Sequence, residues 1–257
     1  MRGIDVSHYQ QGLDLSALAG TIDFVIVRVA QGVRIFDESA PVFYTAARRG
    51  EIPVGCYQYS EALTPEQAEA EAHYLLSWFR GWPMPCGVYM DVEMTAQLRL
   101  PAAQLQAVVD AWCRVIREAG YTPGVYSSEL SAWSKLDAAA LGDDVLIWVA
   151  RYGRAPDMAC DVWQSSETGS VPGWAKGVDT DVAMSQRFAR LVEGGLPQSA
   201  EPTAPPEEEP AADSCPIGDG CASTDISVEL ALLAEYLQTK DFQAGFLAFV
   251  AGKEHIA

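Results

Sequence analysis

The sequence contains little positive charge. Its 257 residues include 17 lysines and arginines against 35 aspartates and glutamates, which gives a net charge of −18. Proteins that bind nucleic acid contact its phosphates through clustered lysines and arginines, so this composition argues against nucleic acid as a partner. The same shortage argues against binding to an anionic membrane surface, where basic clusters provide the attraction.

Long apolar runs, metal-ligand patterns and an export signal are also missing. No apolar run reaches the roughly 18 residues that a membrane-spanning helix needs, so we expect no membrane insertion. The three histidines lack metal-ligand spacing and no phosphate-binding motif occurs, so we expect neither a metal nor another cofactor. The first residues show no apolar segment followed by a cleavage site, so a Sec signal peptide is not expected.

The six cysteines are widely scattered along the chain. Four of them lie in apolar segments, where we expect buried free thiols: Cys56, Cys86, Cys113 and Cys160. The other two, Cys215 and Cys221, flank the short turn pattern Pro-Ile-Gly-Asp-Gly. A local disulfide and a pair of surface thiols are both open at that turn.

The order of the predicted elements indicates an α/β fold. Short apolar runs bounded by turn residues predict eight strands, at 3–7, 24–31, 54–60, 87–93, 124–127, 145–152, 161–165 and 177–183. Helical patterns lie between the earlier strands, at 40–49, 64–80 and 101–119. This alternation predicts a parallel sheet closed into a TIM-like barrel. The links 153–160 and 166–176 contain no convincing helix, so we expect outer helices to be missing in the last third of the barrel.

The composition changes after the predicted barrel domain, which we assign to residues 1–197. Residues 198–213 contain four prolines and five acidic residues and predict an extended linker. Residues 214–257 contain two amphipathic helical patterns, at 225–238 and 240–253, and predict a small α-helical C-terminal module. A segment of this size cannot build a secure core of its own. Docking on the barrel or association into a homo-oligomer would cover its apolar faces.

Acidic side chains occur at several predicted strand ends. Tyr89, Asp91 and Glu93 share one face of their strand, because side chains alternate along a strand. Taken alone, this pair of carboxylates is also explained by a solvated strand end. Asp5 lies in the first strand, and Asp179 and Asp181 lie in the eighth, which is its neighbour in a closed barrel. The acids therefore converge on one cup, with an aromatic rim formed by Tyr57, Tyr59, Tyr126, Trp148, Tyr152 and Trp163; this combination favours a carbohydrate ligand.

The motifs and their order resemble glycoside hydrolase family 25, the Chalaropsis-type lysozymes that are common among phage endolysins. The resemblance covers about residues 1–192 and rests on GIDVSHYQ at 3–10, FVIVR at 24–28, GCYQY at 55–59, YMDVE at 89–93, GVY at 124–126, WVA at 148–150, WQ at 163–164 and VD at 178–179. It implies a barrel of five β/α units followed by three bare strands. It also implies hydrolysis of the β-1,4 bond between N-acetylmuramic acid and N-acetylglucosamine in bacterial peptidoglycan.

The resemblance implies roles for individual residues. Glu93 would be the general acid and Asp91 its partner, supporting a retaining reaction assisted by the acetamido group of the substrate, and Asp5 and Asp179 would be supporting acids. The substrate-binding residues would be Tyr57, Tyr59, Tyr126, Trp148, Gln164 and Asp181. Three positions depart from the family pattern: Gln58 stands where His is usual, Val29-Ala30 where Ala-Thr is usual, and Asp181 where Asn is usual. Because of these three departures, the details of substrate contact and the pH optimum stay open.

Two other functions are compatible with the sequence. A chitinase-like N-acetylglucosaminidase also ends a strand with D-x-E, although the longer acidic run typical of that family is absent before Asp91. A non-catalytic cell-wall-binding protein could have kept the cup. For an endolysin-type lysozyme, the missing Sec signal predicts synthesis in the host cytoplasm and action on the wall after release through holin-type pores or lysis. The C-terminal module would then serve oligomerisation or wall targeting.

Overall fold

A computed structural model of the chain describes residues 1–79 and 81–194. Outside the described residues lie the predicted linker at 198–213 and the predicted module at 214–257. The second includes Cys215 and Cys221, whose pairing therefore stays open. Within the described residues, no helix has the length and apolar character that a membrane crossing needs. Cys56, Cys86 and Cys113 are buried free thiols as predicted, whereas Cys160 is a free thiol that is only half-buried.

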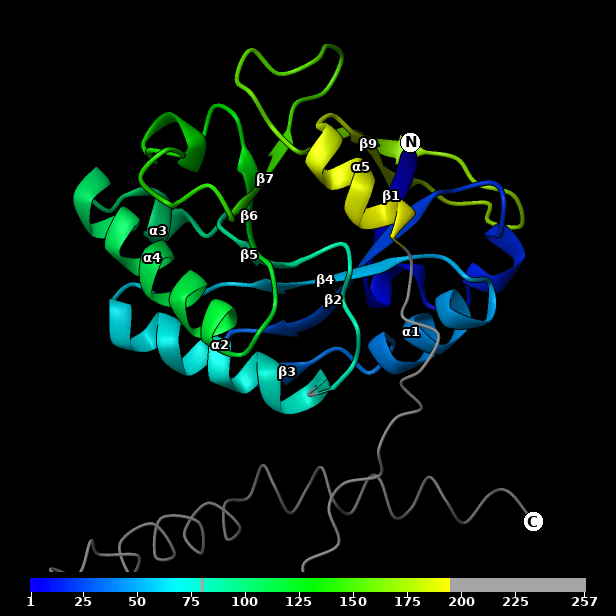
Figure 1. Ribbon diagram of the computed structural model, residues 1–257, viewed down its shortest axis with the longest axis horizontal. Helices are drawn as coiled ribbons and strands as arrows, with labels where there is room; N and C mark the ends of the chain where they lie inside the picture. Colours follow the sequence, from blue (N-terminus) through cyan, green and yellow to red (C-terminus); the bar gives the residue numbers. More distant parts are fainter. Residues whose placement is uncertain (80, 195–257) are drawn as a thin grey trace, which may run out of the picture. The chain divides into compact units, whose positions relative to one another are not determined.

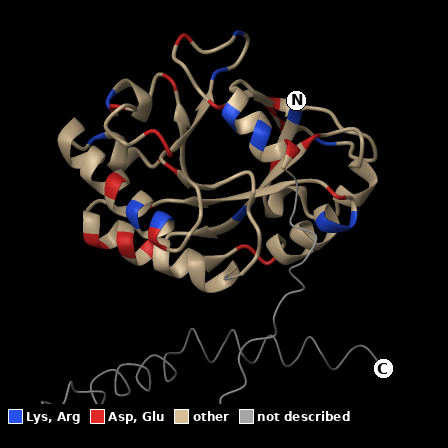
Figure 2. Ribbon diagram, viewed as in Figure 1, with Lys and Arg blue, Asp and Glu red and all other residues tan. Residues whose placement is uncertain are grey.

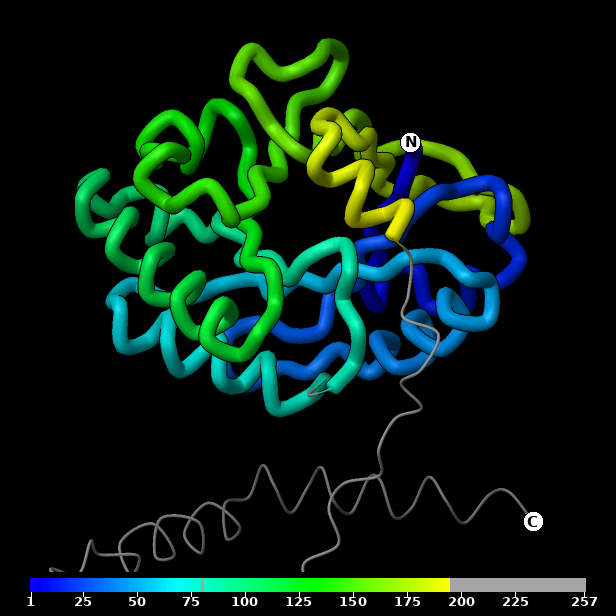
Figure 3. Tube along the Cα trace, viewed as in Figure 1, coloured from blue at the N-terminus to red at the C-terminus, as the bar shows by residue number. Residues whose placement is uncertain are grey.

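The centre of the described chain is a closed barrel of eight strands, as the sequence predicts. Around the ring, each hydrogen-bonded to the next, lie β1 (Arg2–Val6), β9 (Val178–Ala183), β8 (Val162–Gly169), β7 (Leu146–Ala150), β6 (Pro123–Ser128), β5 (Val88–Asp91), β4 (Val54–Tyr59) and β2 (Phe24–Gln31). Pairing of β1 with β2 closes the ring, and Figures 1 and 3 show the first strand lying beside the last. A two-residue strand, β3 (Ile35–Phe36), pairs with β2 on its other side.

One strand runs against the others, so the predicted parallel arrangement does not extend to the end of the barrel. β9 is antiparallel to both β8 and β1. The cause is the short link 170–177, because a parallel crossover needs a dozen or more residues whereas an antiparallel turn needs few. The reversal has a consequence for the site. The beginning of β9, which carries Asp179, lies on the same rim as the ends of the other strands.

Three full α-helices cover the outside of the barrel, at the predicted places. They are α1 (Ala40–Arg49) after β2, α2 (Pro65–Phe79) after β4 and α4 (Ala102–Glu118) after β5 (Figure 1). The N–H of Gln67 donates to Oγ1 of Thr64 at 3.3 Å, so Thr64 caps α2 as expected. Gly120, just beyond α4, has a φ of 84°, the left-handed conformation in which glycine commonly ends a helix.

The other connections are shorter. The first contains two 3-10 helices, η1 (His8–Gln10) and η2 (Leu15–Leu18), and the fifth contains η3 (Ala132–Ser134). The links between β7, β8 and β9 contain no helix, which confirms the expected absence of outer helices in the last third. A single-turn helix that the sequence patterns did not predict, α3 (Thr95–Leu98), follows β5 before α4 begins.

The apolar residues form two layers separated by the barrel wall. Val88, Met90 and Val92 belong to the outer layer under the helices, whereas Tyr89 belongs to the layer inside the barrel. This is the alternation predicted for that strand. Gly124 leaves room for the ring of Tyr89, since a Cβ atom there would lie 2.3 Å from it.

The far end of the barrel interior is closed by a helix that the sequence patterns did not predict, α5 (Gln186–Glu193). Its Phe188 is fully buried and packs edge-to-face on Phe24, with ring centroids 5.0 Å apart. Ser185 caps the helix by accepting the N–H of Phe188.

A polar cluster is buried between the barrel wall and α2 and α4. Trp112 Nε1 donates to Gln58 Oε1 at 3.0 Å, and Gln58 Nε2 donates to the backbone oxygens of Gly32 and Glu71. Gln58 is fully buried and faces these helices, not the cup. On the outer surface, Arg114 of α4 pairs with Glu69 of α2 at 2.6 Å, where Figure 2 shows basic and acidic segments side by side.

Candidate active site

Two cavities that share lining residues lie at the rim where β1, β2, β4 and β5 end. The larger, of about 400 Å³, is lined by Asp5, Val6, Ser7, Tyr9, Gln10, Arg28, Gln31, Tyr57, Tyr59, Asp91, Glu93 and Asp179. The smaller, of about 80 Å³, shares the four acids and Tyr57 with it and adds Tyr126, Trp148 and Gln164. The four acids predicted for the cup therefore lie together. Each position belongs to a strand end, or to the beginning of the reversed β9.

The pairing of β1 with β9 brings three aspartates together. Asp5 is the direct partner of Asp179, and Gly3 is the partner of Asp181, so all three side chains point inward at two successive levels. Gln164 Nε2 donates to Asp5 Oδ2 at 2.8 Å. Asp181 lies at the deeper level, 1% exposed, where its Oδ1 accepts from Trp148 Nε1 at 2.9 Å. Asp181 is not among the residues that line the two cavities, so its predicted contact with substrate stays a prediction.

Burial raises the pKa of every acid in this group, and repulsion from a neighbouring carboxylate adds to it in each case. Burial, then the charges of Asp181 and Asp179, raise the pKa of Asp5 well above its usual range. Burial is also the main cause that raises the pKa of Asp179 to about 6 and that of Asp181 to about 8. The group therefore retains protons at a pH where exposed aspartates have lost theirs.

Asp91 and Glu93 end the opposite wall of the cup. Asp91, the last residue of β5, is 4% exposed. Burial and the neighbouring charge of Glu93 raise the pKa of Asp91, against the effect of Arg28. Its Oδ1 is buried and has no hydrogen-bond partner in the described residues. Glu93 reaches the solvent-exposed mouth, where loss of hydration and the charge of Asp179 raise its pKa. Because β9 is halfway around the ring from β5, Glu93 and Asp179 stand on opposite sides of the mouth.

Aromatic side chains form one wall of the smaller cavity. The hydroxyls of Tyr126 and Tyr152 both donate to Gln164 Oε1, each at 2.8 Å. The ring centroid of Trp148 lies 4.4 Å from that of Tyr126 and 6.0 Å from that of Tyr57. Tyr57 and Tyr59 line the larger cavity. The predicted rim residue Trp163 instead donates its Nε1 to the backbone oxygen of Arg151 and lines neither cavity.

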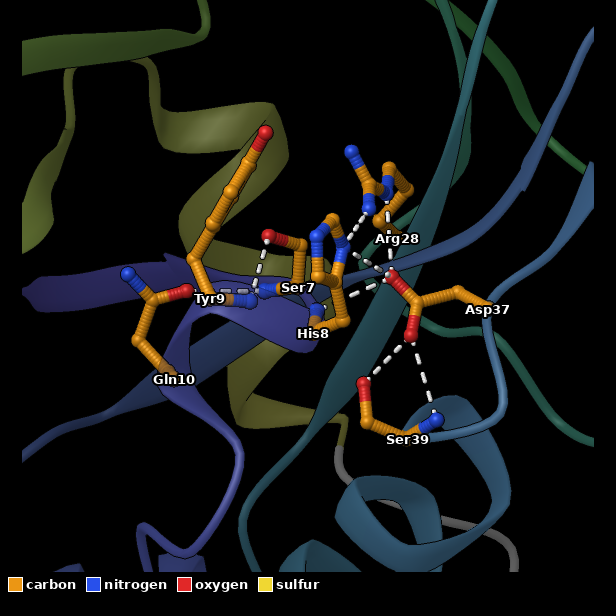
Figure 4. A network of polar contacts seen from close by, with 7 residues as sticks. All are labelled: Ser7, His8, Tyr9, Gln10, Arg28, Asp37 and Ser39. Atoms are coloured by element: carbon orange, nitrogen blue, oxygen red, sulfur yellow. Dashed lines mark hydrogen bonds and ion pairs between the residues drawn. The ribbon is translucent and has the colours of Figure 1, made fainter.

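Arg28 lines the larger cavity and was not among the predicted site residues. Its Nε donates to Asp37 Oδ2 at 3.0 Å, and its second guanidinium nitrogen contacts His8 Nδ1 (Figure 4). Asp37 also accepts from the backbone N–H groups of His8 and Ser39. Although burial acts to raise it, the hydrogen bonds from Ser39 and His8 and the charge of Arg28 hold the pKa of Asp37 below its usual range. A fixed cation therefore stands in an otherwise acidic cup.

Two sequence signals could have identified the missed cavity residues. Phe24 and Ile26 face the barrel interior, so Arg28, two positions further along β2, lies on the same face. Tyr9 and Gln10 follow directly after the strand that carries Asp5, in the loop that a barrel uses for its site. The capping box between Ser7 and Gln10 fixes this loop, with Gln10 Oε1 accepting from the N–H of Ser7 at 3.0 Å.

A third cavity, of about 630 Å³, begins on the other side of Glu93. It is lined by Glu93, Ser128, Leu130, Ala150, Arg151, Tyr152, Gly153, Arg154 and Glu167. Glu93 therefore stands between two open spaces, an arrangement that suits an acid acting on the middle of a chain-like substrate. In residues 1–79 and 81–194, no three histidine, cysteine or acidic side chains are arranged so that they could hold a metal ion together.

Comparisons with known proteins agree with this architecture. Residues 4–174 match the profile of the glycosyl hydrolases family 25. No curated protein matches the sequence. Among solved structures, the catalytic domain of endolysin ply40 from bacteriophage P40 of Listeria monocytogenes is 25% identical, with a TM-score of 0.63 over 75% of this chain and 97% of that chain.

Two further solved structures share the fold at lower identity. The CTP1L endolysin is 18% identical, with a TM-score of 0.65 over 75% of this chain and 69% of that chain. The bacterial lysozyme from Streptomyces coelicolor is 21% identical, with a TM-score of 0.60 over 75% of this chain and 95% of that chain.

Proposed function

Because the chain belongs to glycosyl hydrolase family 25 and is a glycoside hydrolase of the lysozyme type, we propose that it cleaves peptidoglycan at the β-1,4 bond between N-acetylmuramic acid and N-acetylglucosamine. One observation carries the proposal. A carboxyl group with a raised pKa, Glu93, lines two cavities and lies two residues after the buried Asp91. The bacterial cell wall is the proposed site of action.

Glu93 is the proposed general acid. A glycosidic oxygen leaves readily only when it is protonated, so the acid must still hold its proton near neutral pH. The raised pKa of Glu93 supports this role, since loss of hydration and the charge of Asp179 oppose its ionisation. Its position between two cavities lets sugar units bind on either side of the bond to be cleaved.

Asp91 is the proposed partner of the reacting acetamido group. Two carboxylates at positions i and i+2 of one strand lie on the same side of the substrate, so Asp91 does not suit attack from the opposite side. Its buried Oδ1 lacks a hydrogen-bond donor in the described chain. The N–H of the substrate's 2-acetamido group would supply that donor. This hydrogen bond would orient the acetamido group so that its carbonyl oxygen can attack the anomeric carbon. This mechanism predicts net retention at the anomeric carbon.

Replacing the acid tests the assignment. We expect Glu93→Gln to reduce peptidoglycan turnover by more than about 10²-fold, because general acid catalysis contributes 10²–10⁴-fold. Its thermal unfolding should match that of the wild type, and Glu118→Gln, an exposed change on α4, should keep full activity. Normal turnover by Glu93→Gln would show that another group donates the proton.

The product anomer tests the mechanism separately. NMR of the first-formed product should show the retained configuration. An inverted product would require a base on the other face of the sugar. Asp179, across the mouth from Glu93, would then be the candidate.

The C-terminal region has a proposed role that rests on sequence alone. Residues 214–257 contain two amphipathic helical patterns joined to the barrel by the Pro/Glu-rich segment 198–213. We propose that they associate with a second copy of the chain, because two short apolar faces need a partner surface. Light scattering of the full chain and of a chain ending at residue 197 should give different masses per particle. Equal monomer masses would exclude self-association.

A further inference from the structure

Asp181 is a buried carboxyl group for which the proposed mechanism has no use. Its Oδ1 accepts from Trp148 Nε1 at 2.9 Å. Its Oδ2 is buried and meets no N–H or hydroxyl donor in the described chain. The group close enough to affect it is another carboxyl, that of Asp5 on the neighbouring strand β1. Asp5 is itself 4% exposed and accepts from Gln164 Nε2 at 2.8 Å.

We propose that Asp181 is a positioning residue that shares a proton with Asp5 and so holds Asp5 in place at the floor of the substrate cavity. The effect on turnover rests on the proposed function, because it requires Asp5 to act on a bound substrate. The shared proton itself does not, since it follows from the arrangement of the two side chains.

The geometry requires a proton between the two groups. An ionised carboxylate can only accept hydrogen bonds, so two ionised carboxylates cannot bond to each other. Two ionised carboxylates at this depth would lose their hydration without gaining a partner, which disfavours that state. The register allows the contact, since Asp181 is paired with Gly3 and its side chain extends inward diagonally from that of Asp5, whose direct partner is Asp179. One proton between them removes a charge and supplies the missing donor.

The electrostatics agree with this arrangement. Burial raises the pKa of Asp181 to about 8; the charge of Asp179 adds to this effect, and the hydrogen bonds with Trp148 and Asp5 oppose it. Arg28, on β2, is the only cation that lines the larger cavity in the described residues, and it is bound to Asp37. The other titratable groups that surround the pair are Asp179 on β9, Tyr57 on β4, Tyr89, Asp91 and Glu93 on and after β5, Tyr126 on β6, Tyr152 after β7, and the ion pair of Asp161 with Arg187.

A shared proton makes the site sensitive to alkaline pH in a specific way. Above the pH at which the pair loses its last proton, the two carboxylates repel each other and Asp5 is no longer held. Activity should therefore fall through two ionisations on the alkaline side, one of Glu93 and one of the pair. Asp181→Asn removes the second ionisation, because its amide donates permanently to Asp5 and its carbonyl oxygen still accepts from Trp148.

The direct test follows the indole N–H of Trp148 by ¹H–¹⁵N NMR from pH 5 to pH 10. In the wild type we expect this resonance to shift with a midpoint near the pKa of Asp181, about 8. In Asp181→Asn the shift should disappear, whereas in Asp110→Asn, a change of the same kind on the exposed side of α4, it should remain. A Trp148 resonance that does not titrate in the wild type, or that titrates equally in Asp181→Asn, would disprove the shared proton.

The kinetic test separates positioning from general stability. At pH 6 we expect Asp181→Asn to lose less than about 5-fold in kcat and Asp181→Ala about 10- to 100-fold, with KM changed by less than about 3-fold, as for loss of one hydrogen bond to a charged group. In a plot of log kcat against pH, the alkaline side should reach a slope of −2 in the wild type and −1 in Asp181→Asn. Identical slopes would overturn the role of Asp181 in turnover. Absence of turnover in the wild type would refute the proposed function, while the NMR titration still decides the shared proton.

Discussion

Gln164 is the residue that joins the aromatic wall of the site to its acidic floor. Its Oε1 accepts from the hydroxyls of Tyr126 and Tyr152, and its Nε2 donates to Asp5. The two hydroxyl donors determine which end of the amide faces Asp5, because only an oxygen can accept from them. The pattern turns a flexible amide into a fixed donor for the carboxyl group at the cavity floor.

We therefore expect Gln164→Leu to lower kcat by about 10- to 100-fold, corresponding to the 1.5–3 kcal/mol typical of a hydrogen bond to a charged group. Asp5 would lose the donor that lowers its pKa, and two tyrosine hydroxyls would lose their acceptor. Kinetics on peptidoglycan fragments would measure the loss, with unfolding midpoints to show that the barrel persists. Tyr152→Phe, which removes one of two donors to the same oxygen, is the milder comparison. Equal kcat values for Gln164→Leu and the wild type would exclude this role.

At the scale of the elements, regular alternation explains what the sequence could predict. Eight strands and three outer helices have periodic apolar patterns, so their places follow from residue spacing alone. Period-two alternation also separates Arg28, which faces the cup, from Gln58, which faces the helices. The site acids could be placed because strand ends in a barrel meet at one rim.

Other elements depend on contacts that residue spacing does not reveal. The reversal of β9 follows from the length of one link, and α5 is a short helix held by the packing of Phe188 on Phe24. The family resemblance implied that Asp181, in β9, contacts substrate. Its depth in the barrel, which decides its chemistry, depends on the β1–β9 register.

The helix α5 should contribute to stability without taking part in the chemistry. Phe188→Ala removes a fully buried ring and leaves a cavity against Phe24, so we expect a loss of about 3–5 kcal/mol in the free energy of unfolding. Turnover per folded molecule should be unchanged, because neither ring lines the site cavities. Urea denaturation would measure the loss, with Gln186→Ala on the exposed face of α5 as the control. A change below about 1 kcal/mol would show that α5 does not seal the barrel.

For the whole molecule, the acidic character has two different origins. Half of the net charge of −18 belongs to residues 198–257, outside the described chain. In the barrel, several acids form ion pairs on the surface, whereas five are gathered in and below one cup: Asp5, Asp91, Glu93, Asp179 and Asp181. The gathered acids hold protons more tightly than they would in an unfolded chain.

The raised pKa values determine how stability should depend on pH. The unfolded chain loses these protons near pH 4, the usual value for exposed carboxyl groups. The folded chain keeps them longer, with the pKa of Asp179 at about 6 and that of Asp181 at about 8. Between these limits the folded state binds more protons than the unfolded state. The free energy of unfolding therefore falls as the pH rises through this window. Below about pH 4 these acids contribute their full stabilisation to the free energy of unfolding. Groups with a lowered pKa, such as Asp37, lose their stabilising contribution there, because they become protonated.

We accordingly expect the melting temperature to be highest near pH 4–5 and to decrease steadily toward pH 8, with each 1 kcal/mol worth about 2–4 °C for a domain of this size. Calorimetry at constant ionic strength would measure the trend. In Asp181→Asn the melting temperature should decrease less between pH 6 and pH 8, because residue 181 then has no proton to lose in that range. Asp110→Asn, at an exposed position, should follow the wild type. A melting temperature that rises from pH 5 to pH 8 would mean that the acids of the cup are stabilised in their ionised form, and that the proton-holding site described above is absent.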